Sequence, residues 1–210
     1  MDLFAIQKSK DDKAFITKSG SLELEVAADI IETSKDIPFV GSLIKIAQVA
    51  INAMDWRYVQ KLSKFLEASE DIDEETVNKF IDNLSEKDYK RISTYIIHLL
   101  YTSEEDGKAE IMGKIYRARL LNKIDNDTML RLCSVVNKCF LPDISHLNEY
   151  CDENGNNDYI TDNLTALGLL QDLGNVYEEK QDGWESTGWG ATKHKLNEVG
   201  VQLLEILQMT

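Results

Sequence analysis

The C-terminal part of the chain contains the stretch that decides the fold, TDNLTALGLL at residues 161–170, together with LNEVGVQLLEIL at residues 196–207. The first stretch predicts a short helix over residues 162–167 that ends at Gly168, after which Leu169 and Leu170 begin an apolar strand. A segment rich in glycine and tryptophan follows and predicts a two-stranded hairpin. The second stretch has apolar residues at helical spacing and predicts a closing helix.

These elements follow the order of a winged-helix module, and their charge bears on what such a module can bind. Binding DNA requires lysine and arginine side chains at the phosphates. Residues 141–210 contain three basic and thirteen acidic side chains and no arginine, a net charge of −10, and the whole chain carries −14. Such a surface repels nucleic acid and anionic lipid and attracts a basic partner, so we expect no nucleic-acid partner. A solvated surface without any partner is the alternative.

The residues before this module have the pattern of a helical bundle. A mixed segment up to Gly20 predicts a loose arm, and helix start signals then recur at Asp73, at Ser85 with Asp88, at Ser103 with Asp106, and at Asp125 or Asp127. Short polar joints predict helices that pack against their neighbours. Pro142 marks a boundary, and a short helix from Asp143 to Tyr150 follows. We predict a mainly α fold, with a helical bundle over residues 1–140 and a winged-helix-like α+β module with a two-stranded wing over residues 141–210.

The most apolar segment, FVGSLIKIAQVAINAM at residues 39–54, is the candidate for membrane contact. Its polar residues fall three and four apart and form one narrow stripe on a helix. The segment contains Lys45 and is shorter than the roughly 20 apolar residues that a bilayer crossing needs. We expect a helix of the bundle, and the alternative is a membrane-inserting helix that uses Leu43, Ile46, Val49 and Ile51.

Catalytic and metal-binding patterns do not occur in the sequence. Nucleophilic catalysis needs a serine or cysteine beside an oriented base, and the histidines are His98, His146 and His194. His98 lies among apolar neighbours, which favours a structural, hydrogen-bonded role. The spacing Cys139-x6-His146-x4-Cys151 is wider than zinc sites favour. The polar segment 152–158 lacks the glycine and glutamate that a calcium loop requires. We therefore expect neither an enzyme nor a cofactor or metal.

The N-terminal residues and the cysteines indicate the compartment. The first eight residues, MDLFAIQK, show no apolar core of signal-peptide length. The three cysteines, Cys133, Cys139 and Cys151, are an odd number in a chain of ordinary size and fit a reducing environment. We expect a cytoplasmic protein.

Aromatic residues in the expected wing are the candidates for an interface. Trp184 and Trp189 lie in the segment QDGWESTGWG, where glycines leave few neighbours to bury them. Exposed aromatic residues at a loop tip often anchor a protein interface. The alternative is that both fold back onto the strands, and a homodimer contact would satisfy both. We assign Trp184, Trp189 and Tyr177 to a protein interface.

Two families resemble parts of the chain. The pattern LTALGLL at residues 164–170, a wing, and KLNEVGVQLL at residues 195–204 resembles the ending of bacterial winged-helix regulators of the multiple-antibiotic-resistance type. The helix expected to enter the DNA groove offers Asp158, Asp162 and Asn163, so the DNA-reading residues of that family do not carry over.

The second resemblance covers more of the chain. The patterns IPFVGSLIK at residues 37–45, KLSKFL at 61–66 and FLPD at 140–143 resemble functionally unassigned bacterial and prophage helical proteins with a winged-helix-like tail. That resemblance implies a setting near phage-defence functions and no catalytic residue.

From these observations we predict a non-enzymatic protein-binding or dimerisation module whose partner is another protein or a second copy of itself, with a regulatory role in a bacterial or phage-conflict setting. A membrane-acting defence effector that uses residues 39–54 is the first alternative, and a DNA-binding transcriptional regulator is the second.

Overall fold

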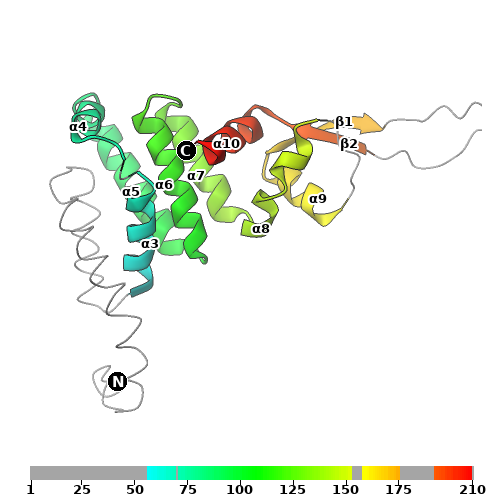
Figure 1. The fold of residues 1–210 in the computed structure, drawn as a ribbon, viewed down its shortest axis with the longest axis horizontal. Helices are drawn as coiled ribbons and strands as arrows, with labels where there is room; N and C mark the ends of the chain where they lie inside the picture. Colours follow the sequence, from blue (N-terminus) through cyan, green and yellow to red (C-terminus); the bar gives the residue numbers. More distant parts are fainter. Residues whose placement is uncertain (1–55, 70, 153–157, 176–191, 210) are drawn as a thin grey trace, which may run out of the picture.

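The computed structural model describes residues 56–69, 71–152, 158–175 and 192–209. In these residues the fold is mainly helical, with a two-stranded antiparallel sheet near the C-terminus (Figure 1). The predicted fold class is confirmed at that level. The apolar segment 39–54, with Leu43, Ile46, Val49 and Ile51, lies outside the described residues. None of the described helices combines the length and the apolarity that a bilayer crossing needs.

Five of the described helices form a bundle at one end of the molecule (Figure 1). They are α3 (Trp56–Glu67), α4 (Glu74–Asp82), α5 (Glu86–Thr102), α6 (Asp106–Leu120) and α7 (Asn126–Lys138). Three of the predicted start signals are confirmed, because Asp73, Ser85 and Asp125 each accept a hydrogen bond from the backbone N–H three residues later. Each side chain thereby satisfies one of the free N–H groups at the start of its helix.

The predicted start signal at Ser103 is wrong. The Ser103 hydroxyl donates to the Leu100 carbonyl, and the Ser103 N–H donates to Leu99, so this residue ends α5. Helix α6 begins at Asp106 after Glu105, whose side chain makes no capping hydrogen bond. A serine hydroxyl can hydrogen-bond to the end of the preceding helix or to the start of the next one. The spacing between Ser103 and Asp106 did not distinguish these two roles.

Helix α6 is the centre of the bundle and contacts α3, α4, α7 and α10. Gly113 allows α3 to approach closely, because a Cβ atom at this position would lie 2.3 Å from the Phe65 carbonyl oxygen. Fully buried side chains on the same helix include Ala109, Met112 and Ile115. Gly113 therefore fixes how near α3 can pack.

The C-terminal elements follow the bundle in the order short helix, 3₁₀ turn, helix, two strands, helix. They are α8 (Leu141–Ile144), the 3₁₀ turn η2 (Leu147–Tyr150), α9 (Tyr159–Ala166), β1 (Leu170–Asn175), β2 (Thr192–Leu196) and α10 (Glu198–Gln208). The short helix predicted from Asp143 to Tyr150 is instead two separate turns, α8 and η2. The backbone N–H groups of Ser145 and His146 bond three residues back, to Pro142 and Asp143, which closes α8 before η2 begins.

The two strands form an antiparallel pair in which Leu170 lies opposite Leu196 and Asp172 opposite His194. The register shifts between Asp172 and Asn175, where Gly174 has a φ of 85°. A φ of this sign favours glycine. Gly168, with a φ of 74°, ends α9 in the same way, which confirms its predicted role.

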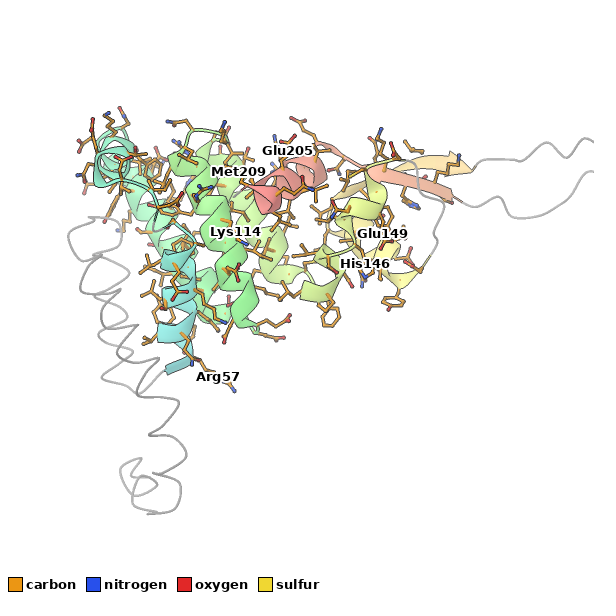
Figure 2. The ribbon with its side chains drawn as sticks, in the orientation of Figure 1. Arg57, Lys114, His146, Glu149, Glu205 and Met209 are labelled. Atoms are coloured by element: carbon orange, nitrogen blue, oxygen red, sulfur yellow. The ribbon has the colours of Figure 1, made fainter. Side chains whose placement is uncertain are left out.

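Helix α10 returns from the sheet to the bundle, so the end of the described chain lies against α6 (Figure 1). Its residues Leu203 and Ile206 are buried, and Met209, labelled in Figure 2, is half-buried against the same core. The buried hydrophobic residues from α3 to α10 form one continuous cluster. The division into residues 1–140 and 141–210 stays a prediction.

Candidate protein-binding surface

Helix α9 presents one face to solvent and buries the other. Tyr159 is 72% exposed, and Asp162, Asn163 and Ala166 are exposed with it. These positions are spaced three and four apart, so they share one side of the helix. Thr161 and Leu164, on the opposite side, are fully buried. We call Tyr159, Asp162, Asn163 and Ala166 the α9 face.

Hydrogen bonds at the start of α9 hold this face in place. The Asp158 carboxylate accepts from the Thr161 N–H at 2.9 Å and from the Thr161 hydroxyl at 3.1 Å. The Thr161 hydroxyl also lies 2.7 Å from the buried Tyr150 hydroxyl of η2. The bond from the Thr161 N–H holds the pKa of the Asp158 carboxyl below its ordinary value. The α9 face therefore sits on a fixed helix and not on a loose loop.

Helix α8 packs beside α9 (Figure 1). The Asn163 amide donates to the buried Asp143 carboxylate at 3.1 Å, which ties the two helices together. Phe140, the residue before α8, is 61% exposed. Residues 158–168 contain two aspartates and no lysine or arginine. The surface carried by α8 and α9 thus combines exposed aromatic rings with negative charge.

A groove of about 620 Å³ lies between α7, the end of α9 and the start of α10. Its lining includes Leu130, Arg131, Val135, Lys138, Ala166 and Leu167. We call this the α7 groove. Arg131 and Lys138 are exposed and lie two helical turns apart on one side of α7. Asp127 also lines the groove, but its carboxylate accepts a hydrogen bond from Arg91 at 2.5 Å, so it adds little free negative charge.

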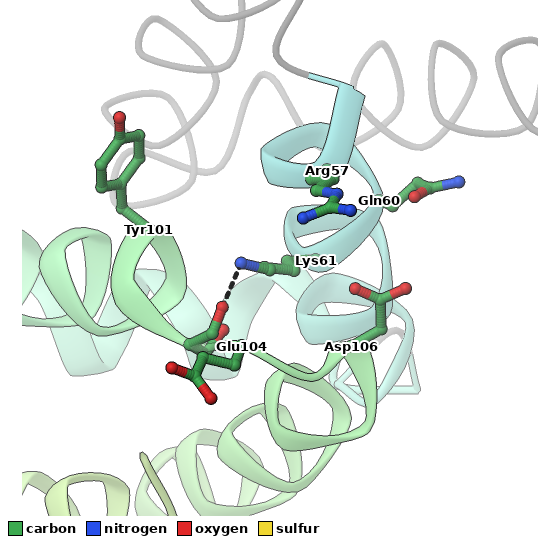
Figure 3. Close-up of a pocket in the computed structure, with 7 residues that line it drawn as sticks. Arg57, Gln60, Lys61, Tyr101, Glu104 and Asp106 are labelled. Atoms are coloured by element: carbon green, nitrogen blue, oxygen red, sulfur yellow. Dashed lines mark hydrogen bonds between the residues drawn. The ribbon is translucent and has the colours of Figure 1, made fainter. Parts of the chain in front are cut away.

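A second hollow, of about 610 Å³, lies between α3 and the loop that joins α5 to α6 (Figure 3). Lys61 reaches across it from α3 and donates a hydrogen bond to the Ser103 carbonyl oxygen. The Lys61 side chain is only 6% exposed. Arg57 and Glu104 also line the hollow. The buried lysine ties two helices together, and we assign it a structural role.

His98 lies on α5, His146 lies in the turn between α8 and η2, and His194 lies on β2. His98 is exposed, which corrects the expectation of a structural histidine packed among apolar neighbours. His146 lies 2.7 Å from the Glu149 carboxylate, and both are labelled in Figure 2. His194 is buried on β2, and its Nδ1 atom has no hydrogen-bond partner in the part of the chain that the structure describes.

The three cysteines are free thiols. Burial raises the pKa of Cys133 to about 12 and that of Cys139 to about 11, so both stay protonated at neutral pH. Cys151 is exposed. Within residues 56–69, 71–152, 158–175 and 192–209, no three His, Cys, Asp or Glu side chains gather closely enough to hold a metal ion.

Comparisons with protein-family models, curated proteins and solved structures find no match to this chain.

The interface residues predicted from the sequence, Trp184, Trp189 and Tyr177, lie outside the described residues. Tyr159 and Phe140 are exposed in the structure and were not among the interface residues predicted from the sequence. The signal for Tyr159 was present, because it stands opposite the buried positions Thr161 and Leu164 at helical spacing. The position of Arg131 beside α9 was harder to predict from the sequence, because it depends on how α7 and α9, which are distant in the chain, pack together.

Proposed function

We propose that this protein is a non-enzymatic protein-binding module, and that residues 141–209 form a winged-helix-like unit whose α9 face contacts the partner. The observation that carries the proposal is the composition of that face. Tyr159 is 72% exposed beside Asp162, on the helix that a DNA-binding winged helix would insert into the groove. The resemblance to prophage proteins adds a bacterial or phage-conflict setting to the proposal.

The charge and burial of α9 support a protein partner over a nucleic acid. A DNA-contacting helix places cations at the phosphates. The charged side chains of α9 and of the residue that caps it are instead the carboxylates of Asp162 and Asp158. Exposed aromatic rings on a rigid helix are the residues that most often dominate binding energy at protein interfaces. The order of elements from α8 to α10, with the strand pair β1–β2 before α10, supports the winged-helix-like assignment.

The proposal is tested by affinity capture from the native host with a Tyr159→Ala/Asp162→Lys variant as bait. We expect the partner to be recovered with wild type and lost with the variant, because truncating an anchoring aromatic residue costs about 2 kcal/mol, roughly 30-fold in affinity. Tyr101→Ala is the matched control, since Tyr101 is 65% exposed on α5. Equal recovery with all three baits would count against the α9 face.

A Trp184→Ala/Trp189→Ala bait tests the wing separately. If the partner is lost with this bait alone, the interface lies on the wing and not on α9, and the protein-binding function stands.

A DNA-binding regulator is the second candidate, because Arg131 and Lys138 lie beside the end of α9. Asp162 interrupts the positive surface that a duplex would need. Fluorescence anisotropy with a labelled duplex decides between the two functions. The protein-binding proposal expects no salt-dependent affinity, whereas steeply salt-dependent binding that Arg131→Glu/Lys138→Glu abolishes would establish the regulator.

A further inference from the structure

We propose that a second copy of this chain docks with its α9 face on the α7 groove, and that the same contact forms in reverse, giving a two-fold symmetric dimer. This inference rests on the proposed protein-binding function and names its partner. The two surfaces have opposite charge and lie next to each other on one molecule. The following observations on described residues lead to it.

The charged side chains of both surfaces are available for ion pairs with another molecule. Arg131 and Lys138 in the groove and Asp162 on α9 are exposed, and none of them forms an ion pair with another residue in the described ranges. Asp127, the acid of the groove, is already bound by Arg91. The groove is therefore a local positive surface on a chain whose net charge is −14. Electrostatic complementarity favours a negatively charged occupant.

The apolar residues of the two surfaces also complement each other. Leu130, Val135 and Leu167 line the groove and are only partly buried. Tyr159 is the most exposed of the large hydrophobic side chains in the described residues. An aromatic ring set against partly exposed aliphatic side chains buries apolar area on both partners. The occupant that fits is a negatively charged helix face with an aromatic residue, which is the chemistry of the α9 face.

The position of Ala166 connects the two surfaces. This residue belongs to the α9 face and also lines the α7 groove, so the negative and positive surfaces meet along α9. A two-fold dimer requires one continuous patch in which residue i meets residue j and residue j meets residue i. Adjacent surfaces of opposite charge satisfy that requirement, because each copy offers its acidic part to the basic part of the other.

The area that a stable interface buries also favours a second copy over an isolated acidic peptide. Stable protein interfaces bury about 1,200–2,000 Å² in total. A peptide would use the groove alone, whereas the symmetric dimer uses the groove and the α9 face of both copies. The reciprocal contact doubles the area that a single docking event would bury.

Charge reversal on each side of the contact tests the dimer by sedimentation velocity. Wild type should be a dimer whose affinity weakens as salt is raised. Arg131→Glu and Asp162→Lys should each weaken dimerisation by about tenfold or more, because each places like charges together twice in the symmetric interface. Lys123→Glu, at an exposed lysine in the loop after α6, is the matched control and should leave the dimer intact. Circular dichroism of each variant checks that the helices are retained.

Mixing the two weakened variants is the decisive experiment. In the mixed dimer, one copy carries Arg131→Glu and the other carries Asp162→Lys. The two substituted positions then face each other with opposite charges in one contact, and the native Asp162 and Arg131 face each other in the other contact. We expect the mixture to recover most of the wild-type affinity. A monomeric wild type, unchanged dimerisation of the single variants, or a mixture that stays monomeric would each overturn the proposal.

The dimer and the protein-binding function fail in different ways. If wild type is monomeric but still captures a partner that depends on Tyr159, the dimer proposal fails and the protein-binding proposal stands. If wild type dimerises and neither charge reversal weakens the dimer, the dimer interface lies elsewhere on the protein.

Discussion

Gly113 shows how one residue sets the spacing of the bundle. The position lies where α6 crosses α3, and an added Cβ would meet the Phe65 carbonyl oxygen at 2.3 Å and the Ala68 Cβ at 2.7 Å. A backbone carbonyl cannot move aside without moving its helix. Gly107, on the same helix, differs because its Cβ would meet only the end of the flexible Leu141 side chain, at 2.7 Å.

We therefore expect Gly113→Ala to destabilise the protein and Gly107→Ala to have little effect or to stabilise it. Overpacking costs about 1–3 kcal/mol, which exceeds the gain of about 1 kcal/mol that alanine brings to a helix. At Gly107 only the helix gain applies. Urea denaturation of both variants measures the difference. Equal stability of the two variants would contradict the close approach of α3 and α6.

Local residue patterns could be predicted from the sequence where the partner is near in the chain. Asp73, Ser85 and Asp125 cap helices through hydrogen bonds to residues three positions on. Gly113 could not be recognised in this way, because its contact residue Phe65 belongs to another helix. The tie between Lys61 and the Ser103 carbonyl was hidden for the same reason.

At the scale of elements, Asn197 joins three segments of the C-terminal part. Its side-chain oxygen accepts from the Gly200 N–H at 3.0 Å and caps α10. Its amide nitrogen donates to the Gly168 carbonyl at 2.8 Å and to the Leu170 carbonyl at 3.3 Å. One side chain thus holds the start of α10 against the end of α9 and the start of β1.

We expect Asn197→Ala to lower the free energy of unfolding by about 2 kcal/mol, because it removes a cap and two further hydrogen bonds. Asn197→Asp keeps the capping oxygen but sets a second carboxylate oxygen against the Gly168 and Leu170 carbonyl oxygens, so it should also destabilise the protein. Asp73→Ala, which removes a cap whose partners all lie on Thr76, should cost about 1 kcal/mol. Urea unfolding ranks the three variants, and a larger loss for Asp73→Ala than for Asn197→Ala would contradict the joining role.

The elements of the candidate surface were predictable only in part. The sequence predicted the helix over residues 162–167 with its end at Gly168, whereas α9 runs from Tyr159 to Ala166. The end was therefore predicted correctly, and the first turn with the exposed Tyr159 was missed. The α7 groove was not predictable, because it forms where α7 and α9, far apart in the chain, pack together. The predicted interface residues Trp184, Trp189 and Tyr177 stay predictions.

For the whole molecule, several aspartates stabilise the fold in their charged form. The pKa of Asp71 is lowered by its hydrogen bonds from Arg117, and backbone N–H groups lower the pKa values of Asp125 and Asp158. A carboxyl with a lowered pKa in the folded state contributes stability above its ordinary pKa, and this contribution is lost as the pH falls through the folded value.

We therefore expect the free energy of unfolding to fall as the pH drops from about 5 to about 3. Asp71→Asn should reduce this dependence by less than about 1 kcal/mol, because the ion pair with Arg117 is partly exposed and screened. Urea midpoints across this pH range, with the exposed Asp82→Asn as control, measure the effect. A pH dependence that is the same in wild type and Asp71→Asn would exclude this ion pair as a contributor.

The return of α10 to α6 has a consequence during protein synthesis. Among the described elements α10 is the last to be synthesised, so the side of α6 that it contacts is left without α10 until residues 198–208 leave the ribosome. We therefore expect a nascent bundle without α10 to leave uncovered the part of the hydrophobic cluster that Leu203 and Ile206 complete. A product that stops before residue 198 would keep that part of the cluster uncovered, and we expect it to be degraded faster than the full chain.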